Sequence, residues 1–101
     1  MIKPMMYCHV VSDKNMQGSG LFNGQILLVT GTKVAPIKQN DPYLQRIFVT
    51  AVKVDKDGTH HFPSEDSEAA IYVVDPRNLE PVNELTQKEL EEQLVARYGG
   101  N

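Results

Sequence analysis

The fold is decided by one stretch of the chain, residues 44–55, which reads LQRIFVTAVKVD. Successive side chains of a β-strand point to opposite faces, so Phe48 and Val52 share one face, and Val49 and Ala51 share the other. Both faces are therefore apolar, which is typical of a central strand or of a strand that curls through a barrel corner. Asp57-Gly58 follows and predicts a tight turn into a short strand at residues 59–62.

Three further strands are predicted outward from this one, at about residues 5–11, 25–34 and 69–74. Asn23-Gly24 precedes the second of them and predicts a hairpin turn, because both residues tolerate positive φ. Pro36 and Pro42 interrupt residues 34–43, so we expect a surface loop of about ten residues there.

The C-terminal part predicts one α-helix at about residues 87–98, because Leu90, Leu94 and Tyr98 recur at every fourth position. Val95 is expected to widen this apolar stripe, and Thr86 is expected to cap the helix. The preceding segment, residues 75–82, contains two prolines and is expected to form turns.

These elements predict a single domain over residues 1–101 of the mainly β (α+β) class. The expected architecture is a small curled antiparallel sheet or open barrel of about five strands with one C-terminal α-helix. With its proline-containing turn at Asp75-Pro76 after the last strong strand, this pattern is similar to SH3-like barrels. The resemblance concerns architecture and implies no catalytic residues, because such folds host many functions.

Charge is divided unevenly along the chain, whose formal net charge is −3. Residues 1–54 contain six cations and two acids, whereas residues 55–101 contain four cations and eleven acids. Such asymmetry orients contacts with another chain or with a second copy.

No pattern in the sequence marks an active site or a cofactor site. Cys8 is the single cysteine, which excludes an internal disulfide and favours a reducing compartment. The pairs Cys8-His9 and His60-His61 are adjacent in sequence, so the members of each pair point to opposite faces of a strand and do not share one metal ion. We therefore expect a cytoplasmic protein without enzymatic activity, metal, cofactor or membrane anchor.

The remaining interpretation is a non-enzymatic interaction module that acts through protein–protein contact or self-association, as an adaptor, inhibitor, regulator or assembly component. Small compact proteins of this kind are common among the accessory proteins of viruses and mobile elements. The expected contact residues lie in the proline loop and on the exposed side of the helix: Ile37, Tyr43, Glu89, Glu91 and Glu92.

The alternative function is a small-barrel nucleic-acid-binding protein that uses a basic sheet surface. Its candidate residues are Lys33, Lys38, Arg46 and Lys53, with Tyr43 and Phe48 between them as stacking side chains. The sequence pI of about 5.5 and the absence of adjacent basic residues weigh against this alternative.

Overall fold

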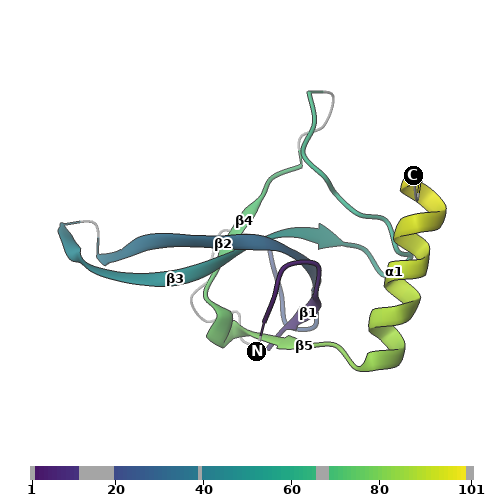
Figure 1. Ribbon diagram of the computed structural model, residues 1–101, viewed down its shortest axis with the longest axis horizontal. Helices are drawn as coiled ribbons and strands as arrows, with labels where there is room; N and C mark the ends of the chain where they lie inside the picture. Colours follow the sequence, from purple (N-terminus) through teal and green to yellow (C-terminus); the bar gives the residue numbers. More distant parts are fainter. Residues whose placement is uncertain (1, 12–19, 39, 66–68, 100–101) are drawn as a thin grey trace.

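The computed structural model describes residues 2–11, 20–38, 40–65 and 69–99, apart from the side chains of Lys38 and Pro42 (Figure 1). Five strands form one sheet in the order β4-β3-β2-β1-β5, and every neighbouring pair is antiparallel. The mainly β, α+β class is confirmed, with one open antiparallel sheet and a C-terminal helix. The elements are β1 (Tyr7–Val10), β2 (Ile26–Lys38), β3 (Asp41–Val54), β4 (Tyr72–Val74), the 3-10 helix η1 (Pro76–Asn78), β5 (Leu79–Pro81) and α1 (Glu84–Tyr98).

The sheet curls because its two edge strands are joined by a short connection. Leu79 at the start of β5 is only five residues after Val74 at the end of β4, and the three residues of η1 lie between them. Five extended residues reach at most about 18 Å, and a 3-10 helix shortens that reach. The outer strands of a flat five-stranded sheet lie about 19 Å apart, so the two edges must approach each other.

Apolar side chains pack on both faces of the sheet, as the pattern of residues 44–55 predicts. Leu27 and Ala51 belong to one cluster together with Cys8 and Val10 of β1. Their sequence neighbours Leu28 and Val52 point the other way and pack with Tyr7, Val54 and Leu90 of α1. The central position of this strand is confirmed, since β3 lies between β2 and β4.

A long hairpin projects from this core (Figure 1). β1 pairs with β2 over Ile26–Leu28 only, and β4 pairs with β3 over Val49–Ala51 only. Residues 32–47, here called the arm, pair with each other as far as Lys38 opposite Asp41. Seven strand residues extend about 23 Å, and the molecule is correspondingly elongated, with a longest dimension of 44 Å.

The loop predicted at residues 34–43 is therefore wrong, because β2 and β3 continue through most of it. Each strand of the arm has one free edge, and a missing N–H is tolerated where it would point away from the partner strand. Pro36 lies in such a strand, opposite Gln45. The prolines predicted a loop because a proline removes a ladder hydrogen bond from a strand that has neighbours on both sides.

Two predicted hairpins are confirmed as turns but not as strand pairs. The Gly58 N–H donates to the carbonyl of Asp55, and residues 59–62 then pair through one bridge, between His60 and Val54. Two hydrogen bonds form this bridge, from the Asp55 N–H to the Thr59 carbonyl and from the His61 N–H to the Lys53 carbonyl. The Gln25 N–H likewise donates to the carbonyl of Phe22 across Asn23-Gly24, but Leu21 and Phe22 belong to no strand.

The C-terminal region differs from the prediction in two ways. β5 lies within residues 75–82, where only turns were expected, because the free edge of β1 supplies it with a partner. Helix α1 begins at Glu84 rather than at residue 87, since Asn83 is the N-cap and its side-chain oxygen accepts the Thr86 N–H at 2.8 Å. The prediction that Thr86 caps the helix is wrong.

Candidate interaction site

One face of the arm is apolar and uncovered. Val34 lies directly opposite Ile47, and Tyr43 lies nearer the tip of the arm, in the irregular part of β3 between Gln45 and Asp41. Their exposed fractions are 59% for Val34, 60% for Ile47 and 93% for Tyr43. Contiguous apolar surface of this kind is typical of contact sites on soluble proteins.

The other face of the arm is both apolar and basic. Lys33 lies opposite Phe48, and Ala35 lies opposite Arg46, whose guanidinium carbon is 5.8 Å from the centroid of the Phe48 ring. Leu44 lies two residues beyond Arg46 towards the tip and is half exposed. Over the described part of the chain, Lys33 makes no ion pair.

Arg46 is held at the base of the arm by Asp75, the N-cap of η1. Its Nη1 atom lies 3.3 Å from Asp75 Oδ2, and Arg77 donates to both oxygens of the same carboxylate. The hydrogen bonds from Arg77, followed by the charge of Arg46, hold the pKa of Asp75 below its usual range. The positive charge of Arg46 is therefore partly neutralised, whereas that of Lys33 is not.

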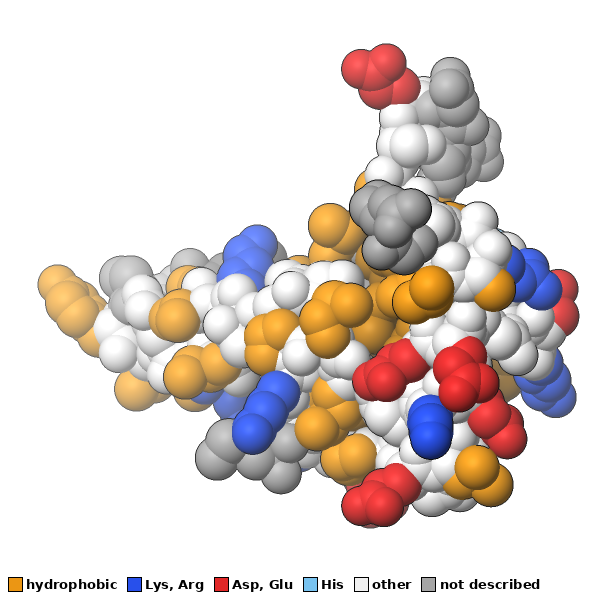
Figure 2. Space-filling view, turned by 45° about the vertical axis from the view of Figure 1, so that its right-hand side comes forward, with side chains coloured by type: hydrophobic (Ala, Val, Ile, Leu, Met, Phe, Trp, Pro, Cys, Tyr) orange, Lys and Arg blue, Asp and Glu red, His pale blue; other side chains and the backbone are white. Residues whose placement is uncertain are grey.

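The outer side of α1 is acidic. Glu89, Glu91 and Glu92 are exposed, as predicted, and no described cation forms a salt bridge with them. Figure 2 shows acidic side chains gathered over the end of the molecule that α1 forms, and hydrophobic side chains spread along the arm. The two predicted contact regions thus lie on separate parts of one molecule.

A shallow, open depression of about 450 Å³ lies on this acidic surface. Val95 is 56% exposed there, so the prediction that it widens the buried stripe is wrong. The inward-facing stripe of α1 consists of Leu90, Leu94 and Tyr98 and does not include Val95. The depression is lined by Lys88, Glu91, Glu92, Val95 and Ala96.

The C-terminal end of α1 is fixed to the sheet by a buried cluster around His60. His60 Nδ1 lies 2.8 Å from the carbonyl oxygen of Gly58, which only accepts, so Nδ1 carries the proton. Nε2 of the neutral ring then accepts from the Tyr7 hydroxyl at 2.6 Å. The Tyr98 hydroxyl accepts the backbone N–H of His60 and donates to its carbonyl, both at 3.0 Å.

Burial keeps this cluster uncharged. It lowers the pKa of His60 below the ordinary value of 6.5, and burial followed by the charge of Glu91 raises the pKa of Tyr7 to about 12. A neutral imidazole and a protonated phenol match the hydrogen bonds that the geometry requires. The cluster joins β1, the loop after β3 and α1.

Gln87 fixes the other end of the helix. Its Oε1 atom accepts the Tyr7 N–H at 2.9 Å, and its Nε2 atom lies 3.3 Å from the carbonyl oxygen of Met5. Since both ends of α1 are tied to the sheet, its acidic side is held in a defined orientation relative to the arm.

The candidate nucleic-acid residues do not form one surface. Lys33 and Arg46 share the basic face of the arm with Phe48, but Tyr43 lies beyond the regular register, nearer the tip of the arm. Lys53 lies near the other end of β3, and the side chain of Lys38 is outside the described residues.

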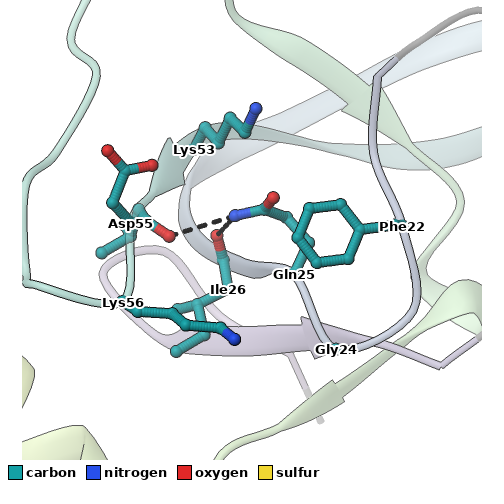
Figure 3. Close-up of a pocket in the computed structure, with 8 residues that line it drawn as sticks. Phe22, Gly24, Gln25, Ile26, Lys53, Asp55 and Lys56 are labelled. Carbon is teal, nitrogen blue, oxygen red and sulfur yellow. Dashed lines mark hydrogen bonds between the residues drawn. The ribbon is translucent and has the colours of Figure 1, made fainter.

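Lys53 instead borders a pocket of about 390 Å³ between the Asn23-Gly24 turn and the end of β3 (Figure 3). The buried Gln25 side chain donates to the carbonyl oxygens of Val54, at 3.1 Å, and Ile26, at 3.2 Å. The other charged residues at its wall are Asp55 and Lys56, so the pocket brings no nucleophile next to a base.

The candidate metal ligands are occupied in other ways. Cys8 is fully buried, which raises the pKa of its thiol to about 11. His61 Nε2 lies 2.8 Å from Asp55 Oδ2, while both ring nitrogens of His60 are used in its own cluster. Over the residues that the structure describes, no three His, Cys, Asp or Glu side chains are placed to hold a metal ion.

Sequence reasoning missed the apolar side chains Val34, Leu44 and Ile47 as surface features of the arm. Their signal was present, because apolar residues continue into the segment between the prolines.

Among the described helices, none is long and apolar enough to cross a membrane. Comparison with protein-family models, curated proteins and solved structures found no match to this chain.

Proposed function

We propose that this protein is a non-enzymatic interaction module that works by protein–protein contact, with the arm as its contacting element. The observation that carries the proposal is the exposure of Val34, Ile47 and Tyr43 on a two-stranded ribbon that extends beyond the sheet, with Val34 and Ile47 directly opposite each other. Burying a large apolar side chain contributes about 1.5 to 3 kcal/mol. A partner that covers this face gains several such contributions.

The backbone of the arm supports the same role. Beyond Gly31 no third strand pairs with β2, and before Val49 none pairs with β3, in the described structure. Each outer edge therefore presents N–H and C=O groups to which a strand of another chain can add. An isolated two-stranded hairpin is only marginally stable in water, so a partner also stabilises the arm itself.

The proposal includes the roles of adaptor, inhibitor, regulator or assembly component, in the cytoplasm. The cytoplasmic location is supported by Cys8, the single cysteine, which lies in the core as a thiol. An SH3-like architecture is supported by the curl of the sheet and by the single 3-10 turn between its edge strands.

The test is a variant in which residues 34–47 are replaced by Asn-Gly. This replacement joins Lys33 to Phe48, which face each other in the register, through a favoured two-residue hairpin turn. Affinity capture from native cells should retain specific proteins on the full chain and lose them on the shortened chain. Lys56→Glu, a charge change outside the arm, is the control, and identical capture by full and shortened chains would reject the proposal.

A nucleic-acid-binding role is the second candidate, favoured by Lys33, Arg46 and Phe48 on one face of the arm. It predicts binding of single-stranded oligonucleotides that weakens steeply as salt increases. Fluorescence anisotropy with labelled oligonucleotides at ~50 mM salt tests it, and an unchanged signal eliminates it.

A further inference from the structure

We infer that the arm of one copy docks on the acidic outer side of α1 of a second copy, so that the chain associates head to tail. This inference rests on the proposed function and names its partner. The observation behind it is that the basic face of the arm and the acidic outer side of α1 carry opposite charge and lie far apart in one molecule.

Charge complementarity is the first step of the argument. The basic face of the arm presents Lys33 without an ion pair in the described structure, next to the cation of Arg46. The outer side of α1 presents Glu89 and Glu92 without described cation partners. Opposite charges of this kind steer two surfaces together and set their orientation.

Apolar complementarity is the second step. Leu44 lies two residues beyond Arg46 towards the tip of the arm and is 48% exposed, and Phe48 on the basic face is partly buried. The acidic side carries Val95, and one helical turn before Lys88 it carries Leu85, which is 69% exposed. The acidic side therefore offers apolar side chains bordered by Glu89 and Glu92 and by the cation Lys88, and the shallow depression at Val95 gives Leu44 a surface to pack on.

The arrangement within one molecule makes this contact intermolecular. The tip of the arm and α1 lie at opposite ends of the molecule (Figure 1). The Tyr98 and Gln87 contacts tie α1 to the sheet, so it does not fold over onto its own arm. Because the two surfaces are different, the contact is heterologous and builds rings or open chains of copies.

The experiment is sedimentation velocity on purified protein over a range of concentrations, with two complementary variants. The arm variant is Lys33→Glu with Leu44→Ser, and the helix variant is Glu92→Lys with Val95→Ser. All four side chains are exposed, so both variants are expected to fold. Lys56→Glu, which repeats the charge change outside both surfaces, is the matched control.

The wild type and the control should associate as concentration rises, and less so at high salt. Each variant alone should associate at least roughly tenfold more weakly, because each loses a charge contact and an apolar contact. An equimolar mixture should form a one-to-one dimer that grows no further, since only one intact arm and one intact helix surface meet.

Two outcomes would overturn the inference. The first is a wild type that stays monomeric at millimolar concentration while the arm-dependent capture of other proteins persists, which leaves the proposed function standing. The second is a helix variant that still dimerises while the arm variant does not, which shows that two arms pack on each other through their uncharged faces.

Discussion

The His60 side chain is the point at which three elements of the chain meet, and each of its ring nitrogens has a fixed partner. Nδ1 donates to the carbonyl of Gly58, and Nε2 accepts from the Tyr7 hydroxyl. Its ring also stacks on Phe62 and meets the Tyr98 ring edge to face. Such a buried polar group is stabilising only while every partner is present.

Tyr7→Phe should lower the free energy of unfolding by about 1 to 3 kcal/mol, because it leaves buried Nε2 without a donor. Urea denaturation at pH 7.5, followed by circular dichroism, measures the change. Tyr43→Phe is the matched control, since its ring is 93% exposed and lies on the arm. Equal effects of the two substitutions would contradict the assigned hydrogen bond.

His60 should also make stability depend on pH. Its pKa in the folded protein is below the ordinary value of 6.5, so between these two values the unfolded chain binds a proton that the folded chain does not. The stabilisation is complete above the unfolded pKa and decreases as pH falls, until the folded pKa is reached. The slope is at most about 1.4 kcal/mol per pH unit.

Urea midpoints measured from pH 7.5 to pH 5 check this dependence. His60→Gln should remove the slope in the window just below pH 6.5. A wild-type profile that is flat in this window would show that His60 titrates equally in both states.

At the scale of elements, the loop after β3 is pressed against α1. Arg97 donates to the carbonyl of Asp57 and to the Thr59 hydroxyl, and Gly58 has a φ of +88°. A Cβ atom built on Gly58 collides with the Gln93 side chain of α1. Glycine is favoured there by the backbone conformation, and a larger residue would also force the Gln93 side chain to rotate away.

Gly58→Ala should destabilise the fold by more than Gly24→Ala. Both glycines have a φ of +88°, but nothing lies within 4 Å of a Cβ atom built on Gly24. Gly24→Ala should therefore cost only the left-handed backbone strain of about 1 to 2 kcal/mol. Thermal and urea denaturation of both variants give the difference, and equal losses would show that the Gln93 side chain rotates away without cost.

At the scale of the whole molecule, stability should be graded along β2 and β3. Leu27 and Val52 lie in strands with neighbours on both sides, whereas Val34 and Ile47 pair only with each other. Amide hydrogen exchange in dilute solution should show the Val34–Ile47 region of the arm at least about 100-fold less protected than the core of the same strands. Uniform protection from the base of the arm to its tip would show that the arm is as stable as the core without a partner.

The helix and the central strand could be predicted from the sequence, whereas the candidate site could be predicted only in part. The residues of one face of α1 recur with the helical period, and residues 44–55 alternate with apolar positions on both sides, so each pattern is local. Glu92 was predicted as an exposed contact residue from the helical pattern, whereas Tyr43 was predicted as one because residues 34–43 were expected to form a loop. Val34, Leu44 and Ile47 were missed, since their exposure depends on how far the neighbouring strands extend.

The sequence by itself determined the class of fold, the buried thiol of Cys8 and the acidic side of α1, because each follows from residues that are close together in the chain. Only the tertiary structure decided that residues 34–43 form strands and that Leu79–Pro81 pair with β1. The physical reason is that a strand takes its hydrogen bonds from a partner far away in the sequence, so its formation and exposure depend on which edges remain free. The same dependence places an uncovered arm at one end of the molecule and an acidic helix at the other.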